Sequence, residues 1–411
     1  MMEIKSNSNT ITYICFMKDR DIYADLLEHS KKKQVTVITG MRRVGKSTAV
    51  KYILQNINHS NYLYLDCERI EIRILFNGLN YEDIRNELEL IGLDISKPAI
   101  VALDEIQLVE NLPSVIKYLY DAYAIKFIVT GSSSYYMKNQ FSESLAGRKR
   151  IFEMYPLSFK EFLNFKDAGV KNFEKYAWQP FNKTWYNKLK DLYAEYIRFG
   201  GFPEVVLEEK QNDKIELLKD IVNSYIELDV KLLSDYTLSE DLYKLAKVLA
   251  ARTGNKVDYT KISSITGINR QKIATYIQLL EYTYFIYQAT PFTKNIDKEI
   301  SQQTKLYFAD TGVLNVLAGE QLSSGQVFEN AIAVQLKSQG TIQYYQKKTG
   351  QEIDFIFNGN TALEVKETPA QQDRQAIEQR AQAIDIDKYL LIGRHLPSSN
   401  FADFIWGGNI Y

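Results

Sequence analysis

The pattern of apolar and polar positions changes near residue 155. From Val35 to Phe152, short β-branched runs alternate with segments of helical spacing. This alternation predicts a parallel sheet covered by helices. The predicted strands are 35–39, 61–66, 99–104, 126–130 and 148–154, and the predicted helices begin at Lys46, Tyr81, Leu112 and Ser134.

Residues from Tyr155 to about 235 predict an all-helical segment. Tyr, Phe, Lys and Glu recur there at helical spacing. The run GGFPEVV at 200–206 interrupts the pattern, because two glycines and a proline do not continue a helix.

The segment 240–310 predicts a helix-turn-helix followed by a hairpin. Helices are expected at 258–266 and 269–283, with Gly267 as the turn and Asn269 as a cap. The runs YFIYQATPF and KLYFAD supply two strands.

The last hundred residues return to mixed α/β. Helices are expected at 326–338 and 371–383, and strands at 341–346, 352–357, 361–366 and 388–392. The predicted domains are therefore 1–155, 156–238, 239–310 and 311–411.

Composition restricts the protein class without identifying a partner. The 411 residues carry a net charge of -1, so no overall basicity indicates nucleic-acid binding. Two cysteines and three scattered histidines give no disulfide framework or metal motif. No apolar run reaches the roughly 18 residues that a membrane span needs. We expect a cytoplasmic protein without a membrane segment.

The run GMRRVGKS at 40–47 is a complete phosphate-binding loop between a predicted strand and a predicted helix. Glycines allow backbone N–H groups to approach phosphate, and the helix directs its positive end at the same anion. Lys46 would reach the β- and γ-phosphates, and Ser47 would offer a hydroxyl to Mg²⁺. The predicted nucleotide-binding residues here are Gly40, Arg43, Val44, Gly45, Lys46, Ser47 and Thr48. The sequence predicts binding of ATP with Mg²⁺, and it leaves the preference for ATP over GTP open.

The run AIVALDE at 99–105 supplies the second half of this site. It places Asp104 and Glu105 at the carboxyl end of a buried strand, where open α/β sheets bind ligands. Asp104 would hold Mg²⁺, and Glu105 would orient and deprotonate the attacking water.

Two further segments offer candidates with open alternatives. In TGSSS at 130–134, Thr130 or Ser132 could sense the γ-phosphate, or these residues could merely cap the next helix. Arg148 in LAGRKR could act as an arginine finger towards a neighbouring subunit's nucleotide, or it could be a solvated surface residue.

The ordered segments GMRRVGKS, ALDEIQ, VTGSSS, LAGRKR and YPLSFKEF resemble those of a family of prokaryotic AAA+-type ATPases. The likeness runs from about residue 33 to 370, and IRFGGFPEVV and FADTGVLN match the lid and C-terminal signatures of that family. The resemblance implies an ATPase core, a helical lid, a winged helix and a C-terminal domain of restriction-endonuclease type. It also implies a homo-oligomer.

An ordered set of charged residues in the last domain is similar to the PD-(D/E)xK nuclease pattern. Glu329 is expected on a helix, Asp354 on one strand, and Glu364 and Lys366 on one face of the next strand. The carboxylates would gather Mg²⁺, and Lys366 would position or activate the attacking water. The alternative is a nuclease-like fold kept for binding or scaffolding.

The helix-turn-helix segment carries a local excess of positive charge. From Arg252 to Lys305 there are eight Lys/Arg against four Asp/Glu. Arg270, Lys272 and Thr275 lie early on the second helix, where a recognition helix contacts nucleic acid. A winged helix that serves as a structural arm is the alternative.

These observations favour an ATPase that couples nucleotide turnover to action on a nucleic-acid or protein partner. Two other functions stay open. One is a slow nucleotide-dependent switch that gates partner binding, and the other is an Mg²⁺-dependent DNA nuclease regulated by ATP.

Overall fold

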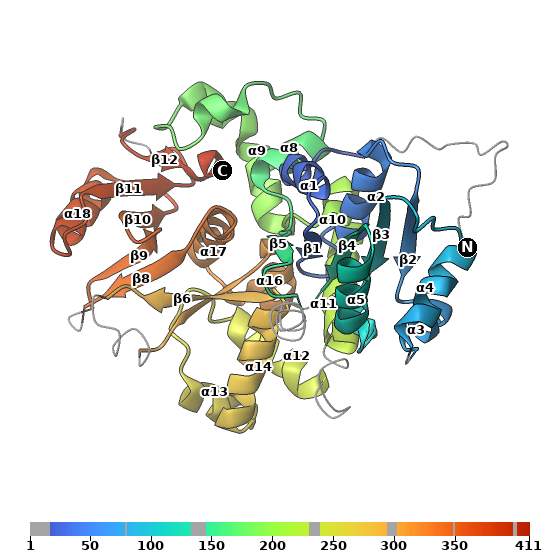
Figure 1. The fold of residues 1–411 in the computed structure, drawn as a ribbon. Helices are drawn as coiled ribbons and strands as arrows, with labels where there is room; N and C mark the ends of the chain where they lie inside the picture. Colours follow the sequence, from blue (N-terminus) through green and yellow to red (C-terminus); the bar gives the residue numbers. More distant parts are fainter. Residues whose placement is uncertain are drawn as a thin grey trace. The chain divides into compact units, whose positions relative to one another are not determined.

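The computed structural model describes residues 17–78, 80–132, 145–229, 239–293, 302–347, 350–397 and 401–411. The chain divides into two compact units, Met1–Met154 and Tyr155–Tyr411. Each unit contains a sheet with helices packed against it (Figure 1). Among the described helices, none is both long and apolar enough to cross a membrane.

A five-stranded sheet forms the centre of the first unit. Its order is β2-β3-β4-β1-β5, and all neighbouring strands are parallel. The strands are β1 (Val35–Thr39), β2 (Tyr62–Asp66), β3 (Ala99–Asp104), β4 (Ile125–Gly131) and β5 (Lys149–Glu153). The helices are α1 (Tyr23–Ser30), α2 (Lys46–Asn56), α3 (Ile70–Phe76), α4 (Tyr81–Leu90) and α5 (Leu112–Ala122). The predicted parallel sheet is confirmed, and the helix predicted from Ser134 lies outside the described residues.

The central strands are mainly apolar because helices cover both faces of a parallel sheet. Every residue of β1 and of β3 is buried. Since all five strands point the same way, the segments that follow β1, β3 and β4 meet at one edge of the sheet. That edge carries the candidate nucleotide site.

The second unit begins with a helical segment. Its helices are α8 (Phe159–Phe165), α9 (Lys183–Phe199), α10 (Pro203–Leu207) and α11 (Gln211–Ser224). A capping box starts α8, because Ser158 Oγ accepts from Glu161 N and the Glu161 carboxylate accepts from Ser158 N. The predicted interruption at 200–206 is shorter than expected. Helix α10 begins at Pro203, since proline suits the first turn of a helix.

The two predicted helices of the helix-turn-helix are confirmed. The described helices of this region are α12 (Ser239–Ala250), α13 (Tyr259–Thr266) and α14 (Arg270–Tyr282). Asp258 accepts from two backbone N–H groups at the start of α13. Gly267 ends that helix in the left-handed conformation, and Asn269 caps α14 by accepting from Gln271 N.

The remaining strands form one seven-stranded sheet with the order β12-β11-β10-β9-β8-β6-β7. They are β6 (Ile286–Pro291), β7 (Lys305–Phe308), β8 (Ile342–Gln346), β9 (Glu352–Phe357), β10 (Thr361–Lys366), β11 (Lys388–Gly393) and β12 (Ile405–Trp406). The predicted hairpin is present as antiparallel β6 and β7. Because β6 also pairs with β8, the hairpin shares a sheet with the C-terminal strands. The domain boundary at 310 stays a prediction.

Helices cover both faces of the C-terminal strands. The helices of this region are α16 (Thr311–Ala318), α17 (Ser324–Lys337) and α18 (Gln371–Gln382). Leu363 of β10 belongs to the core formed with α17, whereas its neighbour Ala362 belongs to the core formed with α18. Successive residues of a strand face opposite sides, so β10 is buried along almost its whole length. The sequence pattern did not predict α16 or β12.

Asp310 joins two segments that lie far apart in sequence. Its carboxylate caps α16 by accepting from Val313 N at 3.0 Å, and it accepts from Gly201 N at 2.7 Å. A Cβ atom at Gly200 would meet this carboxylate at 2.1 Å, and φ is +76° there, so the position requires glycine. Burial raises the pKa of Asp310 to about 6, against the lowering effect of the backbone N–H donors.

Candidate functional site

The phosphate-binding loop connects β1 to α2 and lies against the end of β5. Met154 N donates to Thr39 O at 2.7 Å, which brings the backbone of Met154 close to the loop. A Cβ atom at Gly40 would lie 2.1 Å from Met154 O, and φ of Gly40 is +149°. Only glycine fits this first position of the loop.

The rest of the loop leaves the backbone N–H groups at the start of α2 accessible to an anion. Gly45 precedes α2 with φ +101° and has no side chain that could cover the first N–H groups of the helix. Val44 O accepts from Arg20 Nη1 at 3.0 Å, which holds the middle of the loop. Arg43 has φ +66° and is exposed, as is Thr48.

Lys46 lies across this loop. Its side chain is almost fully buried, and Nζ donates to Gly40 O and Met41 O, both at 3.1 Å. The same Nζ lies 3.8 Å from Glu105 Oε1. The structure therefore brings together the lysine of the loop and the carboxylate that the sequence predicts to be the catalytic base.

Asp104 and Glu105 lie at the carboxyl end of β3, at the same edge of the sheet, and both are buried. Neighbouring strands hold the Asp104 carboxylate from two sides. Tyr64 Oη of β2 donates to Oδ2 at 2.6 Å, and Thr130 Oγ1 of β4 donates to Oδ1. Thr130 Oγ1 also accepts from Glu105 N at 3.1 Å. One buried threonine thus positions both acids.

Gln107 connects the side chain of Glu105 to Ser132. Its amide Nε2 donates to Glu105 Oε2 and, at 3.1 Å, to Ser132 Oγ. Glu105 itself has left-handed backbone angles, φ 51° and ψ 51°, which are uncommon for a glutamate. Non-glycine residues in this conformation concentrate at functional sites.

Two protonated groups border the acids. Burial raises the pKa of Tyr64 well above its usual value, the negative charge of Asp104 adds to this, and hydrogen bonding with Ser47 acts in the opposite direction. Burial, with the charges of Asp66 and Asp104, raises the pKa of Cys67 to about 12. Tyr64 therefore stays a hydrogen-bond donor at neutral pH, and Cys67 stays a thiol.

The donor set at this edge fits a nucleotide with Mg²⁺. The Ser47 hydroxyl, beside Tyr64, and the Asp104 carboxylate are hard oxygen donors of the kind that Mg²⁺ prefers. Such a site leaves the remaining coordination positions to phosphate oxygens and water. The first N–H groups of α2 and the ammonium of Lys46 suit the phosphates themselves.

The sequence predicts most of this neighbourhood but not all of it. It does not single out Tyr64 or Gln107, although each makes a hydrogen bond to one of the two candidate carboxylates, Asp104 or Glu105. The tyrosines that alternate with apolar residues in NYLYLD are a weak hint of Tyr64. Thr130 contacts both acids directly, and Ser132 is linked to Glu105 through Gln107.

Arg148 lies at the other edge of the sheet. It precedes β5 at the amino end, and Arg148 O accepts from Val35 N at the start of β1. The length of β1 separates that edge from the loop by about 16 Å. The Arg148 guanidinium donates to both carboxylate oxygens of Asp121, at 3.0 and 3.3 Å. Arg148 does not reach the phosphate loop of its own chain, so its role towards a neighbouring subunit stays a prediction.

The four residues of the nuclease-like pattern lie on the predicted elements. Glu329 is on α17, Asp354 on β9, and Glu364 and Lys366 on β10. Burial, with the charges of Glu364 and Glu329, raises the pKa of Asp354 well above its usual value, as expected for neighbouring carboxylates. Burial opposes the charge on Lys366, but Glu364 and Asp354 raise its pKa overall.

These carboxylates do not fit a metal ion in their present arrangement. Glu364 accepts from Arg380 Nη1 at 3.1 and 3.2 Å and pairs with Lys366 at 2.8 Å. Asp354 Oδ2 accepts from Val365 N at 2.8 Å. Within the described residues, no group of three or more His, Cys, Asp and Glu side chains could hold a metal ion.

Within the part of the chain that the structure describes, only some of the basic residues on the predicted nucleic-acid surface are exposed and free of an ion pair with an acidic residue. Arg270 is exposed at the start of α14, and Thr275 Oγ1 donates to Gln271 O within the helix. Lys272 is paired with Asp241 at 2.6 Å. Lys305, which the sequence counts among the basic residues of this segment, is buried and therefore not available to a partner. Nucleic-acid binding through 252–305 stays a prediction.

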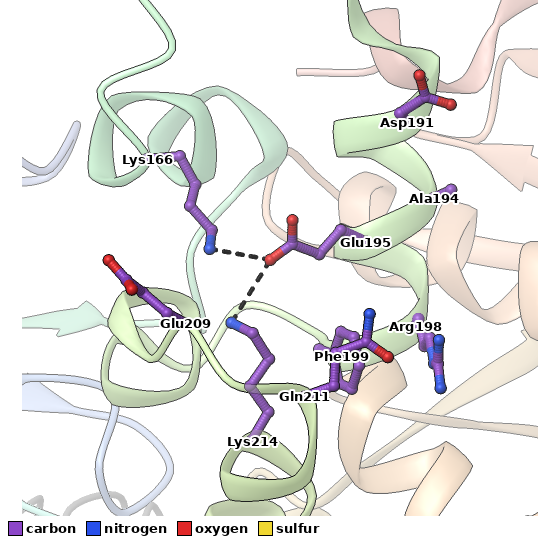
Figure 2. A pocket seen from close by; sticks show the side chains of 9 residues that line it. All are labelled: Lys166, Asp191, Ala194, Glu195, Arg198, Phe199, Glu209, Gln211 and Lys214. Carbon is purple, nitrogen blue, oxygen red and sulfur yellow. Dashed lines mark ion pairs between the residues drawn. The ribbon is translucent and has the colours of Figure 1, made fainter.

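A cleft of about 480 Å³ lies in the helical segment. Figure 2 shows that Lys166 and Lys214 converge on the carboxylate of Glu195, at 2.9 and 3.4 Å from Oε1. Lys214 also donates to Val205 O at 2.6 Å, and burial, together with the charge of Lys166, lowers its pKa. The lining carries basic and acidic side chains in equal number and is formed by Lys166, Asp191, Ala194, Glu195, Arg198, Phe199, Glu209, Gln211 and Lys214. The ion pairs tie the end of α8 to α9 and α11.

Two segments of the chain match known families. Residues 32–163 match the family model of an AAA domain. Residues 190–324 match the model of a domain of unknown function. The first match contains the phosphate loop, both acids and the whole parallel sheet.

Whole-chain comparisons find relatives in archaea and bacteria. The chain is 29% identical over 384 residues to an uncharacterized protein of Methanocaldococcus jannaschii, covering 90% of this chain and 82% of that protein. It is also 27% identical to an uncharacterized protein of Haemophilus influenzae, and this match covers 80% of this chain and 81% of that protein. A Walker-type ATPase of Pyrococcus abyssi has a similar fold, with a TM-score of 0.50 at 16% identity, covering 73% of this chain and 96% of that one. The α/β P-loop fold is confirmed, whereas the winged-helix and nuclease-like interpretations stay predictions.

Proposed function

We propose that this protein binds ATP with Mg²⁺ and hydrolyses it, and that turnover drives a rearrangement of a nucleic-acid or protein partner. The single observation that carries hydrolysis is the position of Glu105. Its carboxylate is buried, lies 3.8 Å from Lys46 Nζ and receives a hydrogen bond from Gln107. A phosphate-binding loop alone would support binding only, and the adjacent, positioned base supports hydrolysis.

Each residue of the site has a separate task in this proposal. Backbone N–H groups of the loop and Lys46 bind the phosphates, and Ser47 and Asp104 hold Mg²⁺. Mg²⁺ held by these two residues would neutralise charge that develops during phosphoryl transfer. Glu105 orients the attacking water and accepts its proton.

Arg148 extends the proposal to an oligomer. It lies at the edge of the sheet opposite to its own loop, so a catalytic role requires the nucleotide of a neighbouring copy. An arginine supplied in this way would stabilise transition-state charge. If it does, Arg148→Ala should lower turnover and, in an equal mixture with Glu105→Gln chains, the two defects should partly complement each other.

Replacing Glu105 by glutamine tests the assignment of the base. The amide keeps the size of the side chain but does not accept a proton. We expect ATP affinity close to that of the unchanged protein, and turnover lower by about 100-fold or more, the usual range for a general base. Glu110→Gln, at an exposed acid that follows the same strand, is the matched control and should leave turnover unchanged. Turnover that persists in Glu105→Gln would show that another group is the base.

The proposal of coupled action has its own measurement. ATP turnover is compared without nucleic acid, with single-stranded DNA and with double-stranded DNA. Stimulation by either DNA supports action on nucleic acid, and it should weaken steeply with salt. A slow rate that no nucleic acid changes would favour a nucleotide-dependent switch that gates a protein partner.

A further inference from the structure

Glu329, Glu352, Asp354 and Glu364 form an acidic cluster in the second unit, and a buried lysine lies beside it. Lys305 on β7 is 5% exposed, and its Nζ lies 3.6 Å from Glu329 Oε1 of α17. The same Nζ forms an ion pair with the carboxylate of Glu352 on β9. The lysine therefore connects its own strand β7 to α17 and β9 through the carboxylates of Glu329 and Glu352.

Glu329 is also held from a second direction. Tyr307 Oη, fully buried on the same strand as Lys305, donates to Glu329 Oε1 at 2.8 Å. The next residue of the helix, Asn330, accepts from Phe308 N at 2.8 Å and donates to Phe308 O at 3.0 Å. Adjacent residues of α17 are thus fixed to β7 by hydrogen bonds that leave Glu329 little freedom to turn towards another ligand.

The position of Lys305 conflicts with a metal ion on the same carboxylates. A divalent cation needs several oxygen ligands at about 2.0–2.6 Å. Glu329 Oε1 already faces an ammonium and a hydroxyl, and Glu352 faces the same ammonium. A metal on these oxygens would place two cations within a few ångströms in a buried site, where repulsion is weakly screened.

The other acids of the nuclease-like pattern have partners of their own. Glu364 is paired with Arg380 and Lys366, and Asp354 accepts a backbone N–H. Every carboxylate of the cluster is therefore matched by a donor from the chain itself, as buried charges require.

We propose that Lys305 is the built-in counter-ion of this acidic cluster and takes the place that a divalent cation holds in a nuclease. The C-terminal domain is then a metal-independent scaffold that joins the hairpin of β6 and β7 to the C-terminal strands. It binds no catalytic metal at Glu329, Asp354 and Glu364, and it does not cleave phosphodiesters.

Counting bound Mn²⁺ by electron paramagnetic resonance tests this proposal. The full chain is titrated without nucleotide, as the unchanged protein and as Asp354→Asn, Lys305→Met and Lys305→Arg. We expect the unchanged protein, Asp354→Asn and Lys305→Arg to bind the same number of ions. Lys305→Met should gain one Mn²⁺, because it frees the carboxylates of Glu329 and Glu352 while keeping the length of the side chain.

Two results would overturn the proposal. One is an Mn²⁺ ion that the unchanged protein binds and Asp354→Asn loses, and the other is a folded Lys305→Met protein that gains none. If Lys305→Met does not fold, the number of Mn²⁺ ions bound by the unchanged protein and by Asp354→Asn still shows whether the acidic residues hold a metal ion. The nucleotide site contributes equally to all four proteins, so this result is independent of whether Glu105 is the base for ATP hydrolysis.

Discussion

Replacing Thr130 by valine tests whether one hydroxyl positions both acids of the nucleotide site. Thr130 is fully buried, donates to Asp104 Oδ1 and accepts from Glu105 N at 3.1 Å. Valine keeps the shape of the side chain and removes both hydrogen bonds. The buried N–H of Glu105 then lacks this partner, and the Asp104 carboxylate keeps Tyr64 as a side-chain donor.

We expect Thr130→Val to lower both the free energy of unfolding and the rate of ATP turnover. A buried N–H without a partner costs about 1–3 kcal/mol of the free energy of unfolding. Loss of a residue that orients a catalytic or metal-binding group lowers activity by about 10–100-fold. ATP affinity should change little, because the loop and Lys46 are the expected ligands of the phosphates. The assays are urea unfolding, phosphate release over a range of ATP concentrations, and binding of a fluorescent ATP analogue.

Thr130→Ser is the matched control, because it keeps the hydroxyl and loses only a methyl group. It should restore most of the turnover that Thr130→Val loses. A Thr130→Val protein with unchanged maximal turnover would refute the positioning role of this residue. A loss confined to ATP affinity would refute it too, because it would place Thr130 at the phosphates instead of the acids.

Three further changes test other parts of the structure. Gly40→Ala should abolish ATP binding in a titration, because the new Cβ would lie 2.1 Å from Met154 O, and retained affinity would contradict this loop geometry. Asp310→Ala should lower the free energy of unfolding by about 2–4 kcal/mol, since the cap of α16 and the partner of Gly201 N are both lost, whereas Asp310→Asn should lose less. Burial lowers the pKa of Lys126 from its ordinary value of 10.5 to about 7 in the folded protein. Between pH 7 and pH 10, Lys126 is therefore protonated in the unfolded chain and largely neutral in the folded chain. Stability should therefore rise from about pH 7 to pH 10, by at most about 1.4 kcal/mol per unit, and Lys126→Met should remove this rise.

The parts of the fold that depend on local pattern could be predicted from the sequence. The strands at 35–39 and 99–104 agree with the structure residue for residue, because each is a mainly apolar run that ends at a glycine loop or at acids. The cap at Asn269 and the turn at Gly267 are equally local. In each case the residues that determine the local structure lie close together in the sequence.

The parts that depend on strand order could not be predicted. Tyr64 reaches Asp104 only because β2 is the neighbour of β3, and packing sets that order. Lys305 counts as a surface charge in the sequence, yet its partners Glu329 and Glu352 come from elements that meet it only in the folded sheet. Arg148 is different, since the start of a strand in a parallel sheet always lies opposite to the loop edge, and the predicted sheet already places it there.

The two signature segments of the second unit acquire a physical explanation in the structure. IRFGGFPEVV contains the end of α9, and FADTGVLN contains the start of α16. Helix ends leave backbone groups without partners, and here side chains of the second segment satisfy groups of the first. Asn315 Nδ2 donates to Arg198 O at the end of α9, and Asp310 accepts from Gly201 N just beyond it. Moving α9 away from α16 would leave these groups without partners, at a cost of about 1–3 kcal/mol for each buried one. Any rearrangement driven by nucleotide turnover should therefore carry α9 and α16 together, and hinges are to be sought in segments that lack such bonds.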